Sequence, residues 1–202
     1  MVFRQPRPSR STASVSTPEP EYDFPVLTEA DLPLIRRWLL EPQVSRWWAD
    51  PPRETYPDDE LEKYQRRIRG EDLVDVFFIR HRGRPIGLIQ SYRIDDHDEY
   101  GTALALDTPS AGIDLFIGEP DLIGKGHGPE LIRSFLRDIV FARSELDECV
   151  IGPSVRNASA LRASEKAGLP FGTDVRVPDG PHPHHLTRTP RHTPPPPADP
   201  RS

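Results

Sequence analysis

The chain is short of cysteine, and that shortage excludes two kinds of protein. Its 202 residues include a single cysteine, Cys149, so it can form neither an internal disulfide nor a cysteine metal cluster. Cys149 stands in an apolar run, where a free cysteine is typically a buried structural thiol. The sequence therefore belongs neither with disulfide-stapled secreted proteins nor with zinc-cluster proteins.

Long apolar runs are also absent. No window approaches the roughly 18 consecutive apolar residues of a membrane-spanning helix, and residues 1–20 hold no apolar core of a secretory signal. The formal net charge of −6 argues against nucleic-acid binding and mildly favours a cationic partner. We expect a cytoplasmic protein with no membrane or nucleic-acid partner.

Hydrophobic residues make up only 35 % of the chain, and the 25 prolines gather at its ends. Four prolines fall in residues 1–20 and nine in residues 178–202. Proline-rich segments with few apolar residues cannot offset their ordering entropy by burial. We predict disordered tails at 1–20 and 181–202 around one domain at 21–180.

Hydrophobic periodicity outlines helices and strands in the middle of the chain. The predicted helices cover residues 31–39, 58–69, 129–142 and 158–167, and the predicted strands cover 75–80, 85–94, 111–118 and 148–154. The first two strands form a hairpin, whereas the helix at 129–142 is a crossover that makes its flanking strands parallel. This order predicts an α/β fold with a mixed central sheet flanked by helices.

Two segments are expected to lie outside regular structure. Residues 41–52 carry Trp47 and Trp48 between prolines and are predicted as a loop. Residues 182–191 (HPHHLTRTPR) do not alternate and contain prolines that a central strand cannot hold, so we expect a poorly formed edge there.

The stretch IGKGHGPELI (123–132) has the composition of an anion site. Its glycines can adopt positive φ and turn backbone N–H groups inward. Pro129 suits the first turn of a helix, whose amino end carries free N–H groups and a partial positive charge. The spacing matches neither a Walker loop nor GxGxxG. A phosphate or pyrophosphate is the ligand that this turn favours, although a ligand-free connection is an equal alternative on the glycines alone.

This turn, together with a second motif, resembles the GNAT superfamily of N-acetyltransferases. The superfamily holds the pyrophosphate of acetyl-coenzyme A (acetyl-CoA) on such a strand, glycine turn and helix. The segment NASALRASEKAGL (157–169) is similar to the superfamily motif in Asn157, Ala160, Glu165, Lys166 and Gly168.

The closer resemblance is to aminoglycoside 6'-N-acetyltransferases, and it runs from about residue 24 to 180. The similar pieces are the tryptophan pair, PIG followed by QSY (85–92), GID-FIG around Asp114, the LIGKG loop and VPDG (177–180). Their order and spacing make this a strong indication of the acetyltransferase fold. The resemblance implies an enzyme that acetylates a primary amine of a small molecule.

The resemblance assigns residues to acetyl-CoA, which acts as a co-substrate. The cofactor-binding residues that it implies are Ile117, Ile123, Gly124, Lys125, Gly126, His127, Gly128, Asn157 and Lys166.

Candidates for the acceptor side are one aspartate and three aromatic residues. Asp114 alternates with Ile113 and Leu115 on a strand, so it faces the opposite side of the sheet, and the resemblance places it near the amine as the proton acceptor. An exposed strand aspartate is the alternative. One residue of the Trp47 and Trp48 pair is expected to line the site, and Tyr92 to lie beside the acceptor or simply pack in its strand.

No metal is expected. His97 and His127 have no partner at metal-ligand spacing, and the histidines of 182–186 lie in the proline-rich end.

The sequence departs from the family at several positions. Ser164 replaces the tyrosine that usually donates a proton to the coenzyme A thiolate, and Ile123 replaces a polar loop residue. Gly152 stands where the aminoglycoside enzymes carry an aspartate, and TALAL (102–106) replaces their acidic substrate loop. These departures leave two alternatives open: a siderophore-pathway lysine N-acyltransferase, in which the apolar loop accepts a longer acyl chain, and a catalytically weak coenzyme A binding protein.

Overall fold

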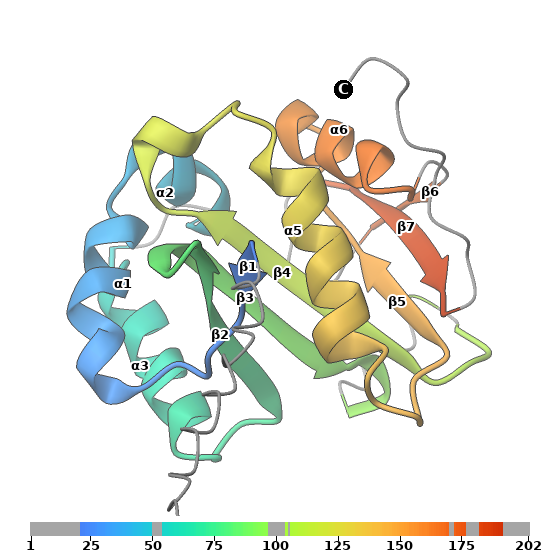
Figure 1. Cartoon of the computed structure of the whole chain (residues 1–202), viewed down its shortest axis with the longest axis horizontal. Helices are drawn as coiled ribbons and strands as arrows, with labels where there is room; N and C mark the ends of the chain where they lie inside the picture. Colours follow the sequence, from blue (N-terminus) through green and yellow to red (C-terminus); the bar gives the residue numbers. More distant parts are fainter. Residues whose placement is uncertain are drawn as a thin grey trace, which may run out of the picture.

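The structure, a computed structural model, describes residues 21–49, 54–96, 104, 106–169, 172–176 and 182–191. A seven-stranded mixed sheet runs through the molecule, with helices on both faces (Figure 1). The strands are β1 (Tyr22–Asp23), β2 (Val74–His81), β3 (Arg84–Arg93), β4 (Ser110–Ile117), β5 (Glu148–Ile151), β6 (Gly172–Val175) and β7 (His184–Pro190). This architecture confirms the predicted α/β class with a mixed sheet.

The helical elements include short 3-10 turns as well as α-helices. They are η1 (Glu29–Asp31), α1 (Leu32–Leu39), α2 (Pro42–Trp48), α3 (Asp58–Ile68), η2 (Ile94–Asp96), η3 (Pro120–Leu122), α5 (His127–Phe135), the π-helical turn η4 (Leu136–Val140) and α6 (Ala158–Lys166). None of the helices in the described ranges is long and apolar enough to cross a membrane.

The strand order in the sheet is β1-β2-β3-β4-β5-β7-β6. All neighbouring pairs are antiparallel except β4 and β5, which are parallel. The connection between those two strands passes through α5, which crosses in front of the sheet in Figure 1. The hairpin and the parallel crossover therefore lie where the sequence predicts them.

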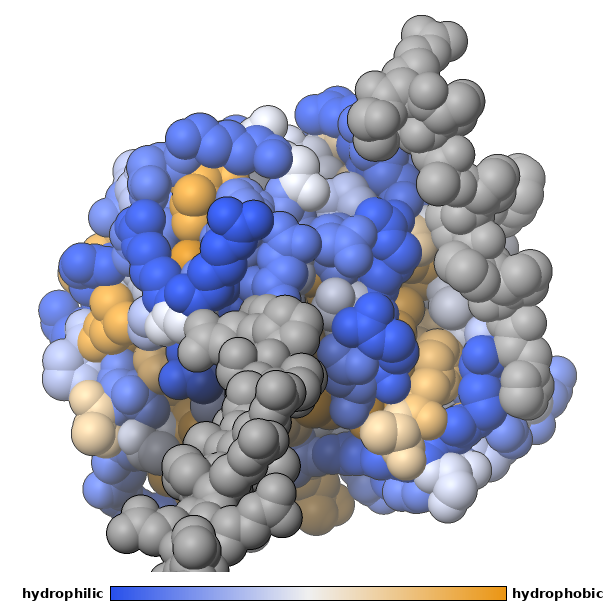
Figure 2. All heavy atoms as spheres, viewed as in Figure 1, coloured by the Kyte–Doolittle hydropathy of each residue, from blue (hydrophilic) through white to orange (hydrophobic). Residues whose placement is uncertain are grey.

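Apolar side chains fill both faces of the sheet. On one face, Leu131 and Phe135 of α5 are fully buried against Ile89 and Ile113 of the strands. On the other face, α1, α2 and α3 pack on β2, β3 and β4, with Trp38 of α1 at the centre of that cluster. The face that Figure 2 shows is mostly hydrophilic outside its grey atoms, and its apolar side chains appear as separate small patches.

Two predictions about regular structure are wrong. Residues 42–48 form α2 instead of a loop, because Pro42 occupies the first helical position, where no donor is needed, and Val44 is buried. The segment at 184–190 forms β7, a strand paired on both sides, with β5 and β6.

The prolines do not disrupt β7, because they stand at its two ends. Pro183 precedes the strand and Pro190 is its last residue, so the backbone donors between them remain available for pairing. The domain thus extends beyond the predicted limit at 180. The remaining tail prediction, at 1–20 and 192–202, lies outside the described residues.

Candidate active site

The strands β4 and β5 pair only briefly before they part. Their parallel pairing runs from Ser110 with Glu148 to Gly112 with Val150, and in the described residues no further pair follows, although β4 continues to Ile117. The β5-facing edge of β4 beyond Gly112 therefore offers backbone N–H and C=O groups to a ligand. This gap between β4 and β5 lies in the middle of the sheet.

The glycine turn follows β4 and opens α5. Gly124 and Gly126 have φ of +75° and +86°, and a Cβ built at either residue would meet no atom within 4 Å. The backbone conformation, rather than crowding, thus favours glycine at these two positions. The helix begins at His127, so the N–H groups of its first turn have no acceptor within the helix and are available to an anion.

Gly128 has a different reason to be glycine. A Cβ at this residue would lie 3.1 Å from Cβ of Ala163, which belongs to α6. Gly128 therefore allows α5 and α6 to pack closely. This contact brings the glycine turn (123–132) next to the second motif (157–169).

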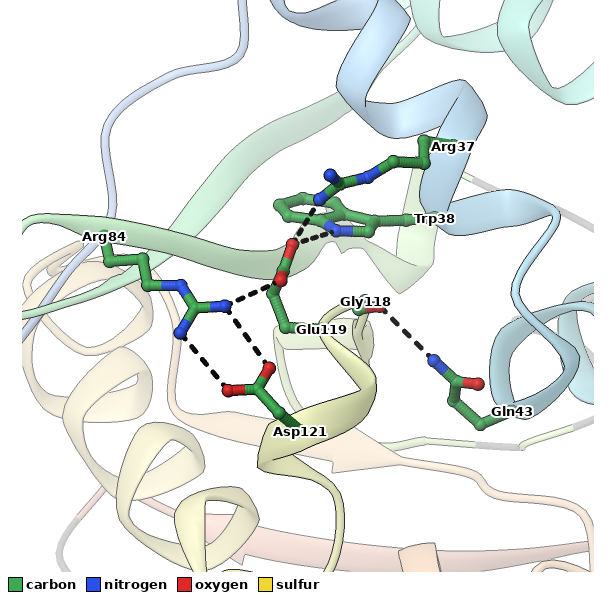
Figure 3. A network of polar contacts seen from close by, with 7 residues as sticks. All are labelled: Arg37, Trp38, Gln43, Arg84, Gly118, Glu119 and Asp121. Carbon is green, nitrogen blue, oxygen red and sulfur yellow. Dashed lines mark hydrogen bonds and ion pairs between the residues drawn. The ribbon is translucent and has the colours of Figure 1, made fainter.

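The segment between β4 and the glycine turn is tied to two other elements, α1 and β3, through Glu119 (Figure 3). The Glu119 carboxylate accepts hydrogen bonds from Trp38 Nε1 at 2.8 Å, from Arg84 Nη2 at 2.7 Å and from Arg37. Although partial burial opposes it, these donors hold the pKa of Glu119 below its ordinary value. Glu119 was not among the predicted residues, because only the folded chain brings its partners together.

Asp114 lies beside the gap, on the face of the sheet opposite α5. Its cross-strand partner is Gln90 of β3, whose Nε2 donates to Asp114 Oδ2 at 2.9 Å. The residue as a whole is partly buried, and desolvation by its surroundings raises the Asp114 pKa above the ordinary aspartate value. The Gln90 hydrogen bond, the charge of Arg67, the charge of His184 and a hydrogen bond with Tyr92 oppose that rise.

Arg67 of α3 extends this polar contact into a chain. Its Nη1 donates to Gln90 Oε1 at 2.8 Å, and its Nε donates to Asp72 Oδ2 at 3.0 Å. The Arg67 side chain is 13 % exposed and Gln90 is 8 % exposed. An ordered row of partners therefore runs from Asp72 through Arg67 and Gln90 to Asp114.

Tyr92 lies next to Asp114 on the same face, as the strand alternation of β3 requires. It pairs with Gly112, where a Cβ would lie 2.4 Å from the Tyr92 ring. The glycine of the GID motif thus gives the ring room to cross β4, and the Tyr92 hydroxyl comes within reach of Asp114.

The two tryptophans differ in their surroundings. Trp48 Nε1 donates to the hydroxyl of the buried Tyr64 at 2.9 Å, and its ring packs edge-on against Phe116 at 4.9 Å between centroids. Trp47 is partly exposed, and the guanidinium of Arg46 lies 5.1 Å from its ring centroid. Trp48 is therefore the one nearer to β4 and the Asp114 face.

The His127 side chain faces away from the glycine turn. Its Nδ1 is 2.7 Å from the Tyr22 hydroxyl, and its ring lies 4.8 Å from that of His81. Burial and the neighbouring His81 lower the His127 pKa, which favours the neutral ring. The His127 side chain is therefore engaged with Tyr22 and His81.

The remaining predicted cofactor residues occupy varied positions. Ile117 ends β4 and packs against the α5 core, whereas Ile123 and Lys125 are exposed in the turn. Asn157 caps α6 by accepting from the Ala160 N–H at 3.1 Å. The Lys166 side chain is exposed.

Ser164 is 2 % exposed on the inner face of α6. The Ser164 side chain is shorter than the tyrosine that the family carries at this position, and the packed helix encloses its hydroxyl. The folded protein therefore places no tyrosine hydroxyl at this point of α6.

Sequence reasoning missed one neighbour of the site, His184, whereas Leu104 belongs to the TALAL loop that the sequence singled out. His184 of β7 lies near enough to Asp114 to favour the ionised carboxylate, and it bridges to Ser154 across the end of β5. Leu104 is nearly buried, and together with Leu106 it packs with Val150 and other apolar residues beside the site. The sequence did not predict His184 beside Asp114, because residues 184–190 were not recognised as a strand.

Comparison with known proteins agrees with this geometry. Residues 28–177 match the sequence profile of the family described as an acetyltransferase (GNAT) domain. The aminoglycoside N(6')-acetyltransferase type 1 of Klebsiella pneumoniae is 29 % identical over 156 residues, which cover 77 % of each chain. The chain belongs to the GNAT acetyltransferase family.

Solved structures show the same fold. The structure of the aminoglycoside acetyltransferase AAC(6')-Ib in complex with paromomycin and acetyl-CoA aligns with a TM-score of 0.70 and 26 % identity, over 85 % of this chain and 94 % of that one. The same enzyme in complex with coenzyme A and kanamycin gives a TM-score of 0.68 and 27 % identity, over 84 % and 95 % of the two chains. The chain is thus an acetyltransferase that resembles the aminoglycoside 6'-N-acetyltransferases.

Proposed function

We propose that the protein transfers the acetyl group of acetyl-CoA to a primary amine, with the 6'-amino group of an aminoglycoside-type molecule as the first candidate acceptor. The observation that carries the proposal is the position of Asp114. It lies on β4, beside the gap between β4 and β5, on the strand that leads into the glycine turn. One element thus connects the proposed donor site with the proposed proton acceptor.

The residues present fit acetyl-CoA. The turn offers unobstructed space beside Gly124 and Gly126, and the amino end of α5 supplies free N–H groups and a partial positive charge for a pyrophosphate. The unpaired edge of β4 suits an extended arm that carries amide groups. Acetyl-CoA supplies the activated thioester carbonyl.

Asp114 has the properties of the group that receives the amine proton. When the neutral amine attacks the carbonyl carbon, a C–N bond forms, the C–S bond breaks and the nitrogen must lose a proton. A carboxylate with a raised pKa is a better proton acceptor near neutral pH than an ordinary aspartate. The leaving thiolate takes a proton from water or from a nearby hydroxyl, since Ser164 is a poor acid.

An acceptor screen tests this proposal. Release of free thiol from acetyl-CoA is measured with kanamycin-type aminoglycosides, lysine and polyamines as acceptors. Turnover with an aminoglycoside and identification of the 6'-N-acetyl product support the proposal. Preference for lysine favours the siderophore-pathway alternative.

The buried Ser164 favours a second candidate, a coenzyme A binding protein with weak catalysis. Thermal unfolding with acetyl-CoA separates the two. Ligand at 100 times its Kd stabilises the folded protein by about 2.7 kcal/mol whether or not chemistry follows. Stabilisation without turnover for any amine identifies the binding protein, whereas no stabilisation contradicts both functions.

A further inference from the structure

The row of side chains behind Asp114 has a fixed direction. Arginine can only donate hydrogen bonds, so the Gln90 atom that faces Arg67 Nη1 must be the amide oxygen. The Gln90 NH₂ group must then face Asp114, where it donates to Oδ2 at 2.9 Å. Arg67 thereby fixes the orientation of the Gln90 amide, so that its NH₂ group faces Asp114.

Arg67 is itself held from two sides. Its Nε donates to Asp72, which follows α3, and its guanidinium lies 5.7 Å from the ring centroid of the buried Tyr64. A planar guanidinium can serve Asp72 and Gln90 at once, which a lysine ammonium on a flexible stem cannot do with the same geometry. The low exposure of Arg67 and Gln90 also limits the competition from water.

We propose that Arg67 is a positioning residue for Asp114: through Gln90 it holds an N–H donor on the carboxylate and keeps Asp114 ionised as a proton acceptor in its dry surroundings. This inference rests on the proposed function for its catalytic meaning. The coupling of Arg67 to the protonation of Asp114 does not depend on the proposed function.

Other groups also act on the Asp114 carboxylate. From the described elements around it, they are the hydroxyl of Tyr92 on β3, the His184 ring on β7 and the Cys149 thiol on β5. Of these groups and Arg67, only the guanidinium carries a charge that does not titrate between pH 4 and pH 9. Removal of Arg67 therefore changes the Asp114 equilibrium in one direction across that range.

The central experiment replaces Arg67 with methionine, which keeps an apolar stem of similar length over Tyr64. The carboxyl titration of Asp114 is followed by ¹³C NMR, with the signal assigned by its loss in Asp114→Asn. We expect Arg67→Met to raise the Asp114 pKa by about one unit, toward the lower end of the effect of a neighbouring opposite charge, because Gln90 stands between the two groups. The acid limb of the kcat/KM profile moves to higher pH in the same direction.

Arg66→Met is the matched control. Arg66 is the exposed neighbour of Arg67 on the same helix, so its loss removes the same formal charge without touching the row. We expect an unchanged Asp114 titration in this variant, with unchanged acetyl-CoA affinity in both variants.

Gln90→Leu provides a second route to the same result. It removes the donor to Asp114 while Arg67 stays, and we expect the Asp114 pKa to rise here too. If Arg67→Met does not fold, Gln90→Leu and Arg67→Lys replace it, and the lysine variant should show a smaller rise because its charge remains. A folded Arg67→Met or Gln90→Leu protein with the wild-type Asp114 titration overturns the proposal.

The NMR measurement keeps this result apart from the proposed function. If the wild-type protein acetylates no amine, the proposed function fails, while the titration still shows whether Arg67 controls Asp114. If turnover is normal but the titration does not respond to Arg67, only the positioning role fails.

Discussion

At the scale of single residues, the site combines side chains whose chemistry depends on a few contacts. Asp114 is the clearest example, because burial raises its pKa while Gln90, Arg67, His184 and Tyr92 restrain the rise. A carboxylate that is balanced in this way can be ionised at neutral pH and still accept a proton.

We expect Asp114→Asn to lower turnover by about 10²-fold to 10⁴-fold, the range typical of general acid-base groups. The amide keeps the shape of the side chain, so acetyl-CoA affinity, measured by calorimetry, should not change. As pH falls through the raised Asp114 pKa, the carboxylate gains a proton and the rate of the wild-type enzyme falls. The asparagine variant lacks this step and retains only the pH dependence of the acceptor amine; a wild-type rate in the variant would contradict the role of Asp114.

The glycine turn gives a second prediction for a single residue. Gly126→Val places a β-branched residue at φ of +86°, and we expect acetyl-CoA binding to weaken by more than tenfold, or about 1.4 kcal/mol. Gly70→Val is the matched control, because Gly70 also has positive φ and open space but lies at the end of α3. Equal acetyl-CoA affinity in the two variants would place the ligand away from the turn.

These residues also show what the sequence can predict. The glycine turn and the strand position of Asp114 were recognisable because local spacing determines them. Arg67, Glu119 and His184 were missed because each owes its place to partners far away in the sequence. The tryptophan pair was predicted in a loop because prolines flank it. The burial of Val44, which stabilises α2, depends on the folded chain and could not be seen locally.

At the scale of elements, the connection from β4 to the glycine turn is anchored by several polar contacts (Figure 3). Glu119 collects donors from α1 and from β3, and Gln43 of α2 donates to the Gly118 carbonyl at 3.3 Å. A Cβ at Gly118 would lie 2.1 Å from the Trp38 ring, so the loop also packs tightly against α1.

We expect Glu119→Ala to reduce the free energy of unfolding by about 1–3 kcal/mol, because the Trp38 indole N–H is left buried without its acceptor. Asp121→Ala is the control, since Asp121 shares Arg84 but is 55 % exposed, and its loss should cost less than about 1 kcal/mol. Chemical denaturation measures both variants. The Glu119 contribution should decline as pH falls through its lowered pKa, because protonation removes the ion pairs; equal effects of the two substitutions would contradict the anchoring role.

At the scale of the whole molecule, the C-terminal part of the described chain completes the sheet. Arg191 follows β7, and its guanidinium donates to the carbonyl of Phe141 at 2.6 Å and to those of Arg143 and Leu146. Arg191 therefore belongs to the folded domain, and we expect only residues 192–202 at this end to be dispensable.

Two truncations test this boundary. A chain that ends after Arg191 keeps all seven strands, so we expect cooperative thermal unfolding and acetyl-CoA binding close to those of the full chain. A chain that ends after Pro183 lacks β7 and leaves β5 and β6 without their shared partner, and we expect loss of cooperative unfolding. A folded, ligand-binding product from the shorter chain would show that the sheet tolerates the loss of β7.

The place of β7 also bears on how the protein is made. This strand is the last of the seven to leave the ribosome, yet it lies between β5 and β6, which are synthesised before it. During translation, one edge of β5 stays unpaired until β7, which covers it, has emerged from the ribosome. Such an edge can pair with another nascent chain, so the yield of folded protein should depend on how quickly residues 184–190 follow β5 out of the exit tunnel.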